Sequence, residues 1–200
     1  MKRKWVVNSI LIILLLTGFF LIYVLWPKEE KLPVLDKVDS FTLQAIDGQE
    51  YSSDNGKVKL LTFFYTKCPD ICPLTMIDFQ KLQAELQNKD LFGKHVELVA
   101  VTLDPVNDTT EGIKSYSQSF GADYDGWKFL RGSEDETRNI ADLYHMKYKK
   151  LEGDFIAHNT TMFLIDQDQQ IRGLFDMANQ NKAVNIEEIV AAMEVLIEDE

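Results

Sequence analysis

The sequence predicts an α/β domain built on a central mixed sheet that helices cover on both faces. Apolar, strand-forming runs at 57–66 and 96–103 are each followed by a segment with helical periodicity. A strand-turn-strand pattern at 161–175 adds an antiparallel part to the sheet, and a helical pattern closes the chain. The two cysteines of the chain, Cys68 and Cys72, lie between the first strand and its helix. This order of elements, with cysteines at a strand-to-helix junction, predicts a thioredoxin-like fold.

The N-terminal segment predicts a membrane anchor. Residues 5–26 carry no charged side chain, and about 20 apolar residues suffice to span a bilayer. Basic residues at 2–4 precede this run, and basic flanks stay in the cytoplasm. We therefore expect residues 1–26 to form a cytoplasmic tip and one transmembrane helix, with the remaining chain outside the cell membrane. The exit from the run lacks the small-residue cleavage site of a signal peptide, and no cysteine precedes Cys68 to carry a lipid.

An N-terminal β-hairpin is predicted to open the domain. Residues 27–38 contain two prolines and several charges, which indicates a linker after the anchor. Strand-forming residues at 41–43 and 50–52 then flank Asp47-Gly48, a strong signal for a tight hairpin turn. We expect the thioredoxin-like domain to cover residues 39–200.

Strands and helices alternate through the rest of the domain. The buried strand at 57–66 leads into a helix at 71–88, where apolar side chains recur at helical spacing. The later elements are a buried strand at 96–103, helices at 109–120 and 134–144 with a short strand at 127–130 between them, hairpin strands at 161–165 and 171–175, and a final helix at 185–198.

The chain is strongly acidic. Its formal net charge is -11, and because residues 2–4 add three positive charges, the part that follows carries -14. Nucleic acid binds through clustered Lys and Arg, so we expect no nucleic-acid partner. A cationic protein or a metal cation fits this charge better, although solubility alone explains it equally well.

Residues 66–73 read Thr-Lys-Cys-Pro-Asp-Ile-Cys-Pro, which places both cysteines where a helix begins. Backbone N–H groups and the helix dipole favour thiolates at such a position. Because residues four apart share a helix face, both sulfurs can converge on one ion, and a disulfide can also form. Oxidoreductases of the thioredoxin type use C-x-x-C, so the longer spacing weakens a redox role without excluding it. Cys68 and Cys72 are therefore candidates both for a redox-active dithiol and for a metal site.

A histidine is the candidate third partner of the cysteines. Thioredoxin-like oxidoreductases carry a cis-proline on the loop that faces their cysteines, but this chain has no proline after Pro105. The corresponding segment, 155–166, contains His158 instead. Two thiolates and one imidazole form a donor set suited to copper, whereas zinc in a structural site usually takes a fourth protein ligand.

Four features together resemble the Sco/SenC family: the anchor, Cys-Pro-Asp-Ile-Cys-Pro at 68–73, Leu-Asp-Pro-Val-Asn-Asp at 103–108, and His158 before a strand that ends Leu-Ile-Asp. The resemblance implies a thioredoxin fold and one copper ion per chain, held by Cys68, Cys72 and His158. It also implies a role in building the CuA centre of cytochrome c oxidase subunit II, either by delivering copper or by keeping the subunit's cysteines reduced.

The resemblance also carries three aspartates over as residues around the metal ligands: Asp70, Asp104 and Asp108. Their roles stay open, since an aspartate before Pro105 is equally a turn former. A membrane-anchored thiol-disulfide oxidoreductase that needs no metal is the main alternative function, and a peroxide-reducing or sensing protein is a third. Whether the chain is an enzyme stays open, with a metallochaperone favoured over a reductase.

Overall fold

The structure is a computed structural model that describes residues 2–25, 31–179 and 183–198. The chain divides into two compact units, Met1–Lys31 and Leu32–Glu200. Part of the predicted linker, residues 27–30, lies outside the described residues.

The first unit contains helix α1, Lys2–Leu25. Large apolar side chains along this helix are exposed, among them Leu15, Leu16 and Phe19. Among the residues that the structure describes, no helix has both the length and the hydropathy required to cross a membrane.

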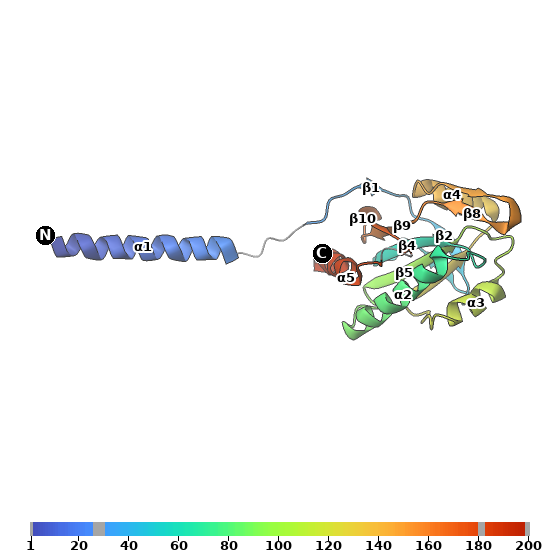
Figure 1. Cartoon of the computed structure of the whole chain (residues 1–200), viewed down its shortest axis with the longest axis horizontal. Coiled ribbons are helices and arrows are strands. Elements are labelled where there is room, and N and C mark those ends of the chain that lie inside the picture. Colours follow the sequence, from blue (N-terminus) through green and yellow to red (C-terminus); the bar gives the residue numbers. More distant parts are fainter. Residues whose placement is uncertain (1, 26–30, 180–182, 199–200) are drawn as a thin grey trace. The chain divides into compact units, whose positions relative to one another are not determined.

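The second unit is built on a mixed sheet in the order β1-β10-β9-β4-β5-β6-β2-β3 (Figure 1). Strands β4, β5 and β6 are parallel, and the other neighbouring pairs are antiparallel. The strands are β1 (Asp36–Lys37), β2 (Thr42–Ala45), β3 (Glu50–Ser52), β4 (Val58–Phe64), β5 (Val96–Thr102), β6 (Trp127–Arg131), β9 (Thr161–Ile165) and β10 (Gln170–Asp176). Every residue of β4 and β5 is buried, as expected at the centre of a sheet. The predicted mixed sheet is confirmed, and β2 and β3 form the N-terminal hairpin.

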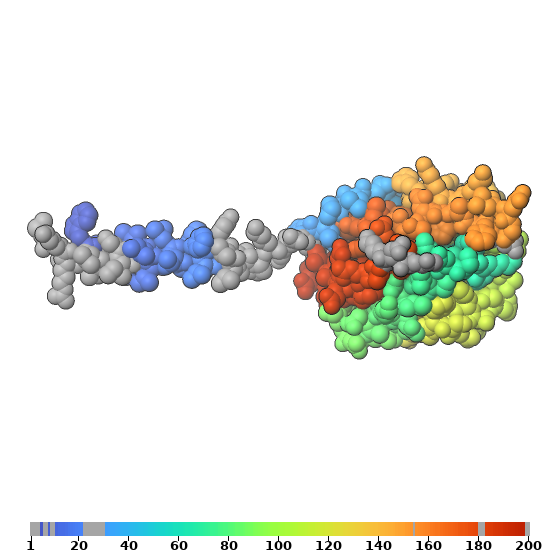
Figure 2. All heavy atoms as spheres, viewed as in Figure 1, coloured from blue at the N-terminus to red at the C-terminus, as the bar shows by residue number. Residues whose placement is uncertain are grey.

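Helices cover both faces of this sheet. They are α2 (Ile71–Asn88), α3 (Thr110–Gln118), α4 (Glu134–Leu143) and α5 (Ile186–Glu198). Successive side chains of a strand point to opposite faces: Phe64 stacks on Tyr116 of α3, whereas Phe63 meets Tyr144 at the end of α4. Figure 2 shows the green and yellow surfaces of α2 and α3 opposite the orange surface around α4.

Residues 32–38 lie against the sheet, although the sequence assigns them to a linker. Strand β1 pairs with β10, with Asp36 opposite Ile171. The Arg172 guanidinium donates to the Leu32 carbonyl and forms an ion pair with Asp166 at 2.8 Å. These backbone and side-chain bonds cover the outer edge of β10, so the compact unit begins earlier than the predicted residue 39.

A two-stranded ribbon outside the main sheet is a feature that the sequence analysis missed. Strands β7 (Tyr148–Lys150) and β8 (Ile156–His158) pair in antiparallel register around the short 3₁₀ turn η1 (Glu152–Asp154), with Tyr148 opposite His158. We call β7, η1 and β8 the histidine ribbon. His158 therefore ends a short strand, whereas the sequence analysis placed it in a loop. Three-residue strands are too short to show a reliable alternation of apolar and polar residues.

Candidate dithiol and metal site

The two cysteines lie where β4 is followed by α2. Cys68 is in the turn between these elements, and Cys72 is the second residue of α2. Only Cys72 is therefore helical, and the two do not share a helix face in the expected way. They nevertheless meet, because the Cys72 backbone N–H points at the Cys68 sulfur at 3.4 Å. Cys68 is half-buried, Cys72 is 1% exposed, and both are free thiols.

The two thiols differ sharply in acidity. A hydrogen bond from the Cys72 thiol lowers the pKa of Cys68 to about 5, and the backbone N–H groups of Asp70 and Cys72 contribute in the same direction. The same hydrogen bond, together with burial, raises the pKa of Cys72. The expectation of easily formed thiolates at the helix start therefore applies to Cys68 alone. At neutral pH, Cys68 is the nucleophilic thiolate and Cys72 keeps its proton.

Tyr65 connects the cysteines to the histidine ribbon, a role that the sequence analysis did not identify. Its phenol interacts with the Cys68 side chain and with the backbone amide of Ile156 in β8. Its ring lies edge-on to the His158 ring, with the ring centroids 6.2 Å apart. Burial raises the pKa of Tyr65 to about 12, so the phenol stays protonated. Its place three residues before Cys68, just past the end of a buried strand, is the signal that could have identified it.

His158 approaches the cysteines through Tyr65. Its Nδ1 lies 2.8 Å from the Asn159 carbonyl oxygen, which requires Nδ1 to be the donor. A neutral ring with that tautomer keeps the Nε2 lone pair for a metal. Within the described residues, however, no three His, Cys, Asp or Glu side chains lie close enough together to hold a metal ion. The structure therefore brings the two sulfurs together and holds the imidazole one aromatic ring away.

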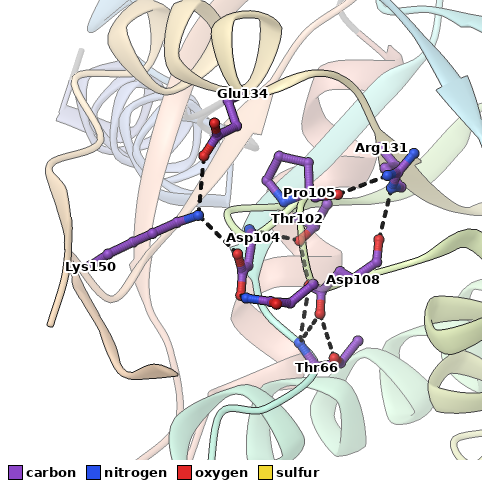
Figure 3. Close-up of polar contacts among 9 residues, drawn as sticks. Thr66, Thr102, Asp104, Pro105, Asp108, Arg131, Glu134 and Lys150 are labelled. Carbon is purple, nitrogen blue, oxygen red and sulfur yellow. Dashed lines mark hydrogen bonds and ion pairs between the residues drawn. The ribbon is translucent and has the colours of Figure 1, made fainter. Parts of the chain in front are cut away.

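Asp70 and Asp108 have different relations to the cysteines. The Asp70 side chain is exposed and does not cap α2. Asp70 acts on Cys68 through its backbone N–H, which helps to lower the pKa of Cys68. Asp108 is buried and accepts bonds from the Thr66 backbone N–H at 3.2 Å and from the Thr66 and Thr102 hydroxyls (Figure 3). Burial raises the pKa of Asp108. Asp108 thus fixes the chain two residues before Cys68.

Asp104 lies behind the site and faces the histidine ribbon. Its side chain accepts a hydrogen bond from the Asn107 amide at 2.8 Å and forms an ion pair with Lys150 of β7 at 3.0 Å. Burial alone would raise the pKa of Asp104, but these two partners hold it below its ordinary value. Asp104 therefore stays charged and bridges the turn after β5 to the ribbon.

The available donors suit a thiophilic metal ion. The site offers one thiolate, one thiol that would lose its proton to a metal, and one imidazole with a free Nε2. Sulfur and imidazole ligands of this kind match copper.

The fold and this site define a class: thioredoxin-like proteins whose dithiol begins a helix and has a histidine nearby. Within that class, the chain belongs to the SCO1/SenC family, whose model matches residues 30–194. The SCO1 protein homolog of Bacillus subtilis (strain 168) is 29% identical to this chain over 144 residues, which are 70% of this chain and 73% of that protein. The predicted resemblance to Sco/SenC proteins is confirmed.

Solved structures agree with this assignment. BsSco, described as a member of the Sco family of cytochrome c oxidase assembly proteins with a disulfide switch, matches with a TM-score of 0.73 and 26% identity, covering 86% of this chain and 100% of that chain. ScoI of Bradyrhizobium japonicum, solved with copper bound, matches with a TM-score of 0.63 and 25% identity over 80% of this chain and 99% of that chain. The thioredoxin-like fold is thereby confirmed.

Proposed function

We propose that this chain binds one copper ion through Cys68, Cys72 and His158 and acts in the assembly of cytochrome c oxidase. The observation that carries the proposal is the thiolate of Cys68 beside Cys72, with His158 across the Tyr65 ring. The copper-bound relative and the assembly role of BsSco support the same conclusion. Copper is the cargo of such a protein, and the thiolates of this site would stabilise it as Cu(I).

The partner in this proposal is subunit II of the oxidase. The chain would help to build the CuA centre there, by delivering copper or by keeping the subunit's cysteines reduced. The predicted membrane anchor at 5–26 belongs to the proposal, with a single pass and an extracytoplasmic domain. The exposed apolar side chains of α1 support it, and a shared membrane raises the effective concentration of a membrane-bound partner.

Copper titration of the reduced protein tests the ligand set. We expect one equivalent of Cu(II) to bind with thiolate-to-copper charge-transfer absorption. His158→Ala removes a ligand, so it should weaken binding by more than the roughly 10- to 100-fold that loss of an outer-shell partner costs. His95→Ala is the matched control, since His95 is exposed and precedes β5 at the opposite end of the sheet from the cysteines. Absence of a stable copper complex in the unaltered protein would refute the proposal.

Thiol-disulfide exchange is the second candidate function, and the unequal acidity of the two cysteines favours it. The Cys68 thiolate would attack a disulfide of the partner, form a mixed disulfide and release one partner thiolate. Cys72 would then lose its proton and attack Cys68, which releases the second thiolate and leaves a Cys68–Cys72 disulfide. The partner gains the two electrons that the dithiol loses. His158→Ala should leave this exchange largely unchanged, so the variant separates the two functions.

A further inference from the structure

The histidine ribbon lies outside the main sheet. Among the described residues, β7 and β8 pair only with each other and not with the main sheet. An isolated two-stranded ribbon is marginally stable in water. His158 lies three residues before β9, so the chain itself anchors that end of the ribbon. The placement of the rest of the ribbon depends on side-chain contacts with the main body, among them burial of Ile156.

Lys150 makes one such contact near the turn of the ribbon, at the end away from His158. Its Nζ lies 3.0 Å from Asp104 Oδ1 and 3.3 Å from Glu134 Oε1, as Figure 3 shows. The Asp104 side chain is 3% exposed and that of Lys150 is 43% exposed, so the ion pair joins a buried anion to the surface. Lys150 stands opposite Ile156 in the ribbon, and the Ile156 amide is the group that meets Tyr65.

The turn that receives Lys150 is itself firmly held. The Asp104 backbone N–H donates to the Thr102 hydroxyl at 3.0 Å, and Arg131 donates to the carbonyls of Pro105 and Asp108, each at 2.8 Å. Asp108 in the same turn binds Thr66, two residues before Cys68. One turn, residues 104–108, is therefore connected to both the dithiol segment and the histidine ribbon.

We propose that Lys150 is a positioning residue, which through its ion pair with Asp104 docks the histidine ribbon on turn 104–108 and so places His158 for copper ligation. The inference rests on the proposed copper function. Loss of Lys150 would leave the buried Asp104 carboxylate without its cation, which favours separation of the ribbon from the turn. The dithiol is held by β4, α2 and Asp108, so it should be unaffected.

The test compares three variants of the full chain in detergent: Lys150→Met, Lys150→Arg and Lys149→Met. Lys149 is the exposed neighbour on β7, and side chains alternate along a strand, so Lys149→Met removes the same charge from the other face. In Lys150→Met, we expect faster amide hydrogen exchange across 148–158 and Cu(II) affinity about tenfold weaker, as for partners that orient a metal ligand. Lys150→Arg should restore both, and Lys149→Met should change neither.

Each outcome decides the proposal. If Lys150→Met matches Lys149→Met in amide exchange, Lys150 does not dock the ribbon. If amide exchange is faster but copper affinity matches that of Lys149→Met, the docking does not place His158 for ligation, and the proposal is refuted. If the unaltered protein binds no copper, the proposed function fails, but amide exchange in the metal-free variants still shows whether Lys150 docks the ribbon. Should Lys150→Met not fold, Glu134→Gln removes the second, more exposed anion, and a smaller acceleration of exchange across 148–158 is then expected, whereas unchanged exchange contradicts the docking.

Discussion

The dithiol segment and the histidine ribbon supply the two halves of one candidate site, but they are held by very different amounts of structure. Cys68 follows β4, whose seven residues are all buried and which pairs with β5 and β9. His158 ends a three-residue strand outside the main sheet. The core therefore fixes the two sulfurs, whereas in our proposal side-chain contacts at Lys150 and Tyr65 help to position the imidazole.

Asp108→Ala should give the largest loss of stability, because it removes a buried support of the dithiol segment. It removes the acceptor for one backbone N–H and two hydroxyls in a buried setting. We expect the free energy of unfolding to fall by about 3 kcal/mol, as when buried donors lose their partner. Urea denaturation measures this, with the exposed Asp70→Ala as control. A loss as small as that of the control would show that Asp108 does not hold the dithiol segment.

Cys72→Ala tests what makes Cys68 a thiolate. Since the hydrogen bond from Cys72 is the main cause of the low pKa, we expect the pKa of Cys68 to rise from about 5 towards its ordinary value of 9.0. The pH profile of alkylation measures it, and Cys72→Ser, which keeps a donor, should fall in between. An unmoved midpoint in Cys72→Ala would assign the low pKa to the helix start instead.

The pKa of Cys68 also predicts how stability depends on pH. The folded-state pKa is lowered from 9.0 to about 5, so the thiolate stabilises the fold fully above pH 9, and this contribution is lost as the pH falls through about 5. The difference in unfolding free energy between reduced protein and Cys68→Ser should therefore increase with pH across this window. A difference that is constant with pH would contradict the assigned thiolate.

Tyr65→Phe tests the connection between the halves. The variant keeps the buried ring and removes the hydroxyl that interacts with Cys68 and with the backbone amide of Ile156. We expect unfolding free energy to change by about 1 kcal/mol, the usual scale of one hydrogen bond, with faster amide exchange at Ile156. Unchanged exchange at Ile156 would mean that Lys150 alone docks the ribbon.

Phe155→Ser should have the smallest effect, because Phe155 is 51% exposed at the tip of the ribbon. Substitutions at exposed positions usually change stability by at most about 0.5 kcal/mol. Thermal and urea unfolding should therefore match those of the unaltered protein. A loss comparable to that of Asp108→Ala would overturn the comparison, since the ribbon would then be as firmly packed as the dithiol segment.

Elements with strong periodicity were predictable from the sequence. The helix expected at 71–88 forms over those residues, and the strand expected at 57–66 contains β4. Long apolar runs define such elements because burial of one face or of the whole strand dominates their energetics. Strand β1 was not predictable, since its partner β10 lies far away in the sequence. The histidine ribbon was not predictable because its three-residue strands are too short to show an alternating pattern.

The amino-acid sequence by itself determined the α/β class, the family, and the residue types that can bind copper: two cysteines four positions apart and one later histidine. Only the tertiary structure decided that Cys68 and not Cys72 carries the low pKa. The hydrogen bond between the thiols lowers the pKa of Cys68, and the same bond together with burial raises the pKa of Cys72. It also decided that Asp104 faces Lys150 and that Tyr65 stands between sulfur and imidazole. The pairs Asp104–Lys150 and Tyr65–His158 join residues that are distant along the chain, and local patterns do not encode such contacts.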